Sequence, residues 1–203
     1  MKTQIVFIDG ENFRQNLITN LEAISNYSLR NKFFRFDIRG LLEDVIGSSN
    51  LEIKYYANSI KTPKNFTPAK ETLTQLEEIK HITREWTAML RSQNIENIKA
   101  GNLKVKEGKA CPKCHKTSEI LQEKGVDVRV ALELFETFYE NKTAELFIVS
   151  SDSDLCPVYH KIKDKGGKIT YIYFPKGMSI GAKMATTSSI LITPKELLSH
   201  LLP

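Results

Sequence analysis

Short runs of β-branched and aromatic residues alternate with longer helical segments along this chain, and this alternation limits the folds that it can adopt. Strands are predicted at residues 3–8, 51–57, 95–105, 145–150, 168–174 and 190–192. Helices are predicted between them at 13–23, 33–46, 69–93, 126–139, 155–165 and 194–202. Strands separated by helices form mostly parallel sheets with helices on both faces. We therefore expect an α/β fold of three layers.

Three aspartates follow two of the predicted strands. Asp9 ends the first strand, and Asp152 and Asp154 follow the apolar run at 146–150. Ligands of parallel sheets bind at the carboxyl ends of the strands, which meet along one edge. An Asp after a strand is often a turn residue or a helix N-cap, but one helix needs only one such cap. At least one of Asp152 and Asp154 is therefore free for another task.

Asp127 opens the helix predicted at 126–139. Counting along that helix places the side chain on the apolar stripe of Ala131, Leu134, Phe135 and Phe138, which should face the sheet. A buried carboxylate costs several kcal/mol unless it is paired or binds a metal. An acid in the first turn also stabilises a helix through its dipole, but that role does not require an inward-facing position. We expect Asp127 to join the other aspartates.

Four carboxylates that meet at one edge of a sheet repel one another unless a cation neutralises them. Ligand sets made only of oxygen favour hard ions, so Mg²⁺ or Mn²⁺ is expected rather than zinc or copper at Asp9, Asp127, Asp152 and Asp154. Such ions bind phosphates and activate water. Hydrolysis of a phosphodiester is the expected chemistry.

The distribution of charge supports a polyanionic substrate. The chain of 203 residues has a net charge of +5. Residues 99–124 hold seven lysines and three glutamates, and residues 161–183 hold six lysines and one aspartate. Each run alone is typical of a solvated surface, but both flank the acidic motifs, which favours a track for a phosphate backbone.

Composition also bears on the cellular location. No apolar run approaches the ~18 residues of a membrane-spanning helix, so no membrane partner is expected. The apolar start up to Ile8 is too short for the core of a signal peptide. Three cysteines form no even framework of disulfides and favour a reducing compartment. We expect a cytoplasmic protein.

Three motifs in order resemble those of the NYN domain family, in its LabA-like branch. The first is FIDGEN at 7–12, in which Asn12 follows Asp9 by three residues, and the second is KGVDV at 124–128. The third is FIVSSDSDL at 147–155, and GGK at 166–168 also fits. The resemblance spans nearly the whole chain. It differs from the family pattern at Ser151, where Gly is usual, and near the last strand, where Ser188 or Ser189 replaces an Asp.

The resemblance implies a PIN-like Rossmannoid fold, a three-layer sandwich formed as a single domain over residues 1–203. It implies a metal-dependent ribonuclease acting on RNA, with single-stranded RNA favoured. The four aspartates would hold the metal and activate water, while Asn12 would orient a water on the metal or a phosphate. Further candidates for substrate contacts are Ser150, Ser151 and Lys124.

The lysine-rich stretch at 106–118 interrupts the α/β pattern and is expected to be an insertion. It contains the CxxCH sequence formed by Cys111, Cys114 and His115, which is spaced for a structural Zn²⁺ but lacks a second half. A zinc site, a substrate clamp and the contact of a homodimer all remain open for this stretch.

Two other functions are compatible with these motifs. A NYN-like module that binds RNA or a protein without cutting would share the fold, and the missing acid near the last strand leaves it open. A nuclease for DNA flaps would share the chemistry, but it normally needs additional helices to thread DNA. Dependence on a divalent metal distinguishes the ribonuclease from the binding module.

Overall fold

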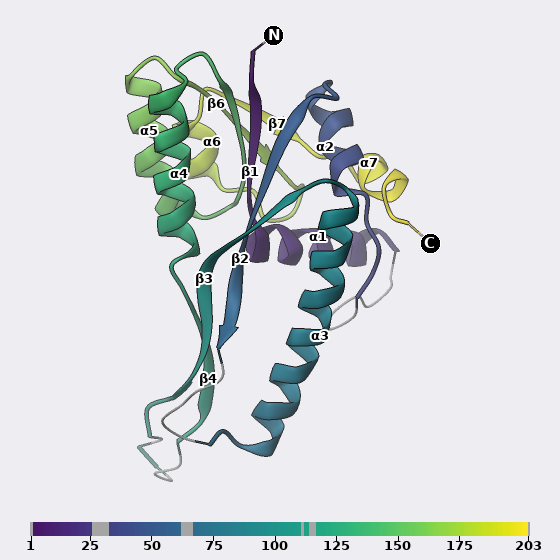
Figure 1. Ribbon diagram of the computed structural model, residues 1–203, viewed down its shortest axis with the longest axis vertical. Helices are drawn as coiled ribbons and strands as arrows, with labels where there is room; N and C mark the ends of the chain where they lie inside the picture. Colours follow the sequence, from purple (N-terminus) through teal and green to yellow (C-terminus); the bar gives the residue numbers. More distant parts are fainter. Residues whose placement is uncertain (1, 26–32, 62–66, 111, 114–116, 203) are drawn as a thin grey trace.

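A single seven-stranded sheet organises the chain in the computed structural model, which describes residues 2–25, 33–61, 67–110, 112–113 and 117–202 (Figure 1). The strands lie in the order β4-β3-β2-β1-β5-β6-β7. All neighbouring pairs are parallel except β3 and β4. The strands are β1 Gln4–Asp9, β2 Leu51–Lys61, β3 Glu96–Glu107, β4 Glu119–Lys124, β5 Glu145–Val149, β6 Lys168–Tyr173 and β7 Ser188–Leu191.

Helices cover both faces of this sheet. They are α1 Gly10–Ser25, α2 Ile38–Ile46, α3 Lys70–Ser92, α4 Val126–Glu140, α5 Cys156–Asp164, α6 Ile180–Ala185 and α7 Pro194–Ser199. Side chains alternate across β1, so Val6 and Ile8 pack with α1, α2, α3 and α7, whereas Ile5 and Phe7 pack with α4, α5 and α6. The expected mostly parallel sheet between two helical layers is confirmed.

Several predicted boundaries were wrong in detail. Helix α1 begins at Gly10 rather than after Asn12, because Asp9 accepts a hydrogen bond from the backbone N–H of Asn12 and acts as the cap. The helix predicted at 33–46 begins only at Ile38, after the N-cap Asp37. Strand β2 continues past a β-bulge at Ala57 and Asn58 to Lys61, beyond its predicted end at residue 57.

The second half of the chain contains two elements that the sequence did not indicate. Strand β4 follows the stretch at 106–118 and returns antiparallel to β3, pairing Asn102 with Lys124. Helix α6 lies between the strands predicted at 168–174 and 190–192, where no helix was predicted. Among the described residues, no helix is both long and apolar enough to cross a membrane.

Gly10 joins β1 to α1 where the backbone is closely packed. An added Cβ would meet the ring of Tyr55 and lie 2.6 Å from the carbonyl oxygen of Tyr56. We expect Gly10→Ala to lower the free energy of unfolding by about 1–3 kcal/mol, as overpacking does, measured by urea denaturation. Gly181→Ala is the control, because its Cβ would lie 3.6 Å from the nearest atom. Equal stability of Gly10→Ala and the wild type would contradict this packing.

Candidate metal centre

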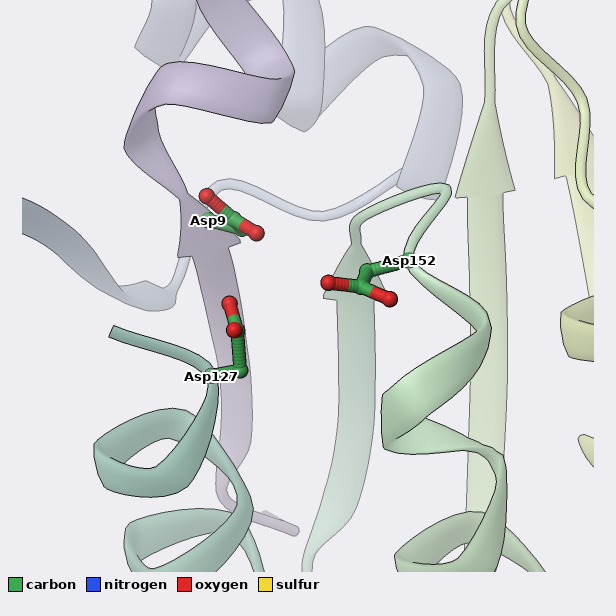
Figure 2. Close-up of side chains that lie close together, drawn as sticks. All are labelled: Asp9, Asp127 and Asp152. Carbon is green, nitrogen blue, oxygen red and sulfur yellow. The ribbon is translucent and has the colours of Figure 1, made fainter. Parts of the chain in front are cut away.

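Three aspartates converge at the carboxyl edge of the sheet (Figure 2). Asp9 ends β1, Asp152 follows the neighbouring strand β5, and Asp127 lies in the first turn of α4. One carboxylate oxygen from each lies within 4.8 Å of the others. The structure therefore brings together three of the four aspartates that the sequence predicted to meet.

Asp9 is the most buried of the three, with 6% of its surface exposed. Its carboxylate accepts hydrogen bonds from the backbone N–H of Asn12 and from the hydroxyl of Ser150, each at 3.3 Å. Burial raises the pKa of Asp9, the charges of Asp127 and Asp152 add to this effect and the two hydrogen bonds oppose it, so that the pKa is about 6. Among the described residues, no ion pair with a basic side chain compensates the charge of deprotonated Asp9.

Asp127 lies at the border of the buried face of α4. The fully buried stripe is Val126, Val130, Leu134 and Phe138, so the predicted stripe was displaced by one position and Asp127 is half-buried. Burial raises the pKa of Asp127, and the charges of Asp152 and Asp154 add to the effect. Gly125 precedes the helix with φ of +92°, a conformation that suits glycine and turns the chain into α4.

Asp152 and Asp154 take different positions in the turn after β5. Asp152 accepts a hydrogen bond of 2.8 Å from the backbone N–H of Asp154 and thereby caps the short 3-10 helix Ser153–Leu155. Asp154 is exposed and is not one of the three converging residues, although its charge acts on Asp127. Asp154 therefore lies at the edge of the candidate metal centre rather than within it.

Hydrogen bonds of Asn12 link α1 to the turn that contains Asp152. Its side-chain oxygen accepts hydrogen bonds from the backbone N–H of Ser151 at 2.9 Å and from Asn16, and its amide nitrogen donates to the Ser151 hydroxyl at 3.0 Å. The Ser150 hydroxyl accepts from the backbone N–H of Asp152. These bonds hold Asp152 against Asp9, and the contact of Asn12 with a water or a phosphate stays a prediction.

A further acid near the centre was not predicted. Glu123 on β4 has its pKa raised to about 7, first by burial and then by the charges of Glu11 and Asp9, while a hydrogen bond from Asn58 lowers it. The neighbouring candidate Lys124 is exposed at the end of the same strand. Glu123 and Lys124 both lie on β4, so their positions near the centre could have been predicted only if β4 had been recognised as an edge strand.

Two other sequence features lie away from this centre or outside the described residues. Cys111, Cys114 and His115 are outside the described residues, so the zinc site stays a prediction. Ser188 and Ser189, where the resemblance predicted an acid, lie on β7, separated from β5 by β6.

The donor set fits a hard divalent cation. Three carboxylates offer only oxygen ligands. The pKa values of Asp9 and Asp127 are raised first by burial and then by neighbouring carboxylates, and a bound cation would stabilise the charged form of both groups. Mg²⁺ and Mn²⁺ prefer such ligands.

Comparison with known proteins places the chain in a family. No curated protein matches it. The solved structure of a protein of unknown function from Vibrio parahaemolyticus shares the fold, with a TM-score of 0.56 and 15% identity over 99% of this chain and 97% of that one. The NYN domain matches residues 4–192 and so includes all three converging aspartates. The chain therefore belongs to the NYN domain family.

Proposed function

We propose that this protein is a ribonuclease that depends on a divalent metal and hydrolyses RNA phosphodiester bonds at Asp9, Asp127 and Asp152. The observation that carries the proposal is the convergence of these carboxylates within 4.8 Å at the carboxyl edge of the sheet. Membership of the NYN family supports a nuclease-like function. The PIN-like relationship and the LabA-like branch are parts of the same proposal.

The three aspartates would hold Mg²⁺ or Mn²⁺, and such an ion supplies charge neutralisation at the phosphate and a lower pKa for water. Asp154 is exposed and its charge acts on Asp127, and in this proposal it would accept a proton from the water that attacks the phosphate. Ser150 and Asn12 hold Asp9 and the turn of Asp152 in position. The protein thus provides fixed ligands and a proton acceptor.

Single-stranded RNA is the proposed substrate. The lysine-rich runs flank the acidic motifs in the sequence, and Lys124 ends β4 next to Gly125, where α4 begins. A cytoplasmic location, a single domain over 1–203 and a homodimer remain predictions from the sequence.

The test is cleavage of end-labelled single-stranded RNA by the purified protein in Mn²⁺, in Mg²⁺ and in chelator. The proposal predicts cleavage in at least one metal and none in chelator. RNA that is bound in chelator but left intact in every metal would contradict the ribonuclease and favour the non-catalytic binding module.

Lys124 is expected to contact a phosphate of the RNA. Lys124→Ala should reduce the slope of log affinity against log salt by about 0.7, the value for one contact with a single strand. The measurement is RNA binding in chelator at several salt concentrations. Lys142→Ala is the control, because Lys142 is exposed between α4 and β5 at the opposite end of the sheet. Equal slopes for the two variants would mean that Lys124 does not contact the RNA.

A further inference from the structure

A cavity of about 270 Å³ lies beside the metal centre, between α3 and the extended strands β2, β3 and β4, with the start of α1 at one side. Its walls include the apolar side chains of Tyr55, Ile79, Ile82, Trp86 and Leu103. The volume is close to the lower end of the roughly 300–1,000 Å³ typical of small-molecule sites. The cavity therefore has room for one small planar ligand.

Unpaired polar atoms are concentrated around this cavity. Seven buried side-chain nitrogen or oxygen atoms lack a hydrogen-bond partner among the described residues, and four of them belong to residues that line it. These four are Arg14 Nη1, Asn58 Oδ1, Trp86 Nε1 and Asn97 Oδ1. Each unpaired group costs about 1–3 kcal/mol. Two donors and two acceptors around one apolar hollow indicate a ligand whose edge carries both kinds of group.

Trp86 gives the clearest single indication. Its side chain is 5% exposed. Its indole N–H is near enough to the Tyr55 hydroxyl to lower the pKa of that group, but the two do not meet the geometric criteria of a hydrogen bond. That hydroxyl already donates to the carbonyl oxygen of Gly10 at 2.7 Å. A buried indole N–H usually finds a partner, and here the described residues leave it without one.

The cavity and the groove next to it differ in the charge of their lining residues. Among the described residues, the cavity is lined by Glu11, Glu78 and Glu123 but by only one basic residue, Arg14, so it disfavours a phosphate. The adjoining groove, of about 500 Å³, shares four lining residues with the cavity, and the charged residues that it adds from the described part of the chain are all basic. Its basic residues are Lys80, Arg84, Arg91 and Lys99. A nucleotide chain matches this division, because its bases are neutral and its phosphates are anionic.

The cavity also adjoins the three aspartates. Gly10, which lines it, directly follows Asp9 in the chain. Glu123 lines it too and interacts electrostatically with Asp9 and Asp127. A base in the cavity would therefore belong to a nucleotide close to the bond that is cut.

We propose that this cavity is a base-binding pocket, which accepts the neutral heteroaromatic base of a ribonucleotide while the flanking phosphates lie in the basic groove. Asn58 and Asn97 accept hydrogen bonds from the edge of the base, and Arg14 and Trp86 donate to it. The role of the pocket in cleavage rests on the proposed function, and its binding of a base does not. The pocket would select which nucleotide lies next to the scissile phosphate.

Trp86 is the single tryptophan of the chain, so its fluorescence reports on the cavity directly. We would titrate the protein in chelator with AMP, GMP, CMP and UMP, and with ribose 5-phosphate as the matched probe without a base. At least one nucleotide should give a saturable change, and ribose 5-phosphate should give none. Asn58→Ala should weaken that nucleotide about tenfold, the loss of one buried hydrogen bond.

Two further variants distinguish a loss of nucleotide binding from a loss of folding. Asn102→Ala, on β3 but outside the cavity, should bind like the wild type. Thr83→Phe should fill the cavity and abolish binding without loss of cooperative unfolding. No saturable change with any nucleotide, an equal response to ribose 5-phosphate, or unaltered binding by folded Asn58→Ala and Thr83→Phe would overturn the pocket.

The same titration separates this inference from the nuclease proposal. Asp152→Asn should bind the nucleotide normally in chelator. Binding without any metal-dependent cleavage would support the pocket and contradict the ribonuclease. Cleavage by a protein that shows no nucleotide binding would overturn the pocket and leave the ribonuclease standing.

Discussion

Asp152→Asn is expected to slow RNA cleavage by on the order of 10²–10³-fold, the size of effect seen when one group that stabilises a transition state is removed. The substitution keeps the shape of the side chain, and the asparagine oxygen can still accept the hydrogen bond from the backbone N–H of Asp154. The turn should therefore persist, while the charge that attracts a divalent cation is lost. The measurement is the single-turnover rate of cleavage of end-labelled RNA.

Asp164→Asn provides the control for Asp152→Asn. Asp164 is exposed at the end of α5, and its variant should cleave at the wild-type rate. If Asp152→Asn cleaved as fast as Asp164→Asn, the three aspartates would not be the nuclease centre.

Asp9→Asn should stabilise the folded protein in the absence of metal. The substitution removes a buried charge that no ion pair among the described residues compensates. The pKa of Asp9 is raised from 3.8 to about 6, and at 1.36 kcal/mol per unit this amounts to roughly 3 kcal/mol. The asparagine can accept from the N–H of Asn12 and donate to the Ser150 hydroxyl, so both neighbouring contacts can remain. Asp9→Asn in chelator at pH 7 should be more stable than the wild type by up to about that amount.

The pH dependence of this effect has a defined sign. Between pH 4 and 6 the folded protein binds more protons at Asp9 than the unfolded chain does, so the stability contributed by protonated Asp9 is present below pH 4 and is lost as the pH rises through about 6. Urea denaturation in chelator at pH 4 and pH 7 should show a smaller decrease for Asp9→Asn than for the wild type. Equal decreases in the two proteins would mean that Asp9 is not raised in pKa by its burial.

Much of the fold followed from local patterns. Apolar runs predicted β1 and β5, which are parallel neighbours in the sheet. Because an aspartate follows each run, the sequence alone could predict that Asp9 and Asp152 lie close together at the carboxyl ends of the strands. Asp127 followed from helical periodicity, although the stripe was displaced by one position. These inferences succeeded because each rests on the spacing of side chains within one element or on the rule that parallel strands end at one edge.

The remaining features depend on contacts between distant segments. Strand β4 has no strong alternation, since its residues are half-buried or exposed, and only its pairing with β3 makes it a strand. Glu123 was missed for that reason. The cavity beside Trp86 arises from the packing of α3 against β2 and β3, and the bonds of Asn12 to Ser151 join residues 139 positions apart. Local propensity contains no information on such juxtapositions.

The central claim is that RNA is cut only when Asp9, Asp127 and Asp152 hold a divalent cation. The most direct test measures Mn²⁺ occupancy by electron paramagnetic resonance and single-turnover RNA cleavage on the same samples over a range of Mn²⁺ concentrations. Occupancy and rate are expected to rise with the same half-saturation in the wild type and to be lost together in Asp152→Asn. Cleavage in chelator, or a filled metal site with every RNA left intact, would contradict the claim.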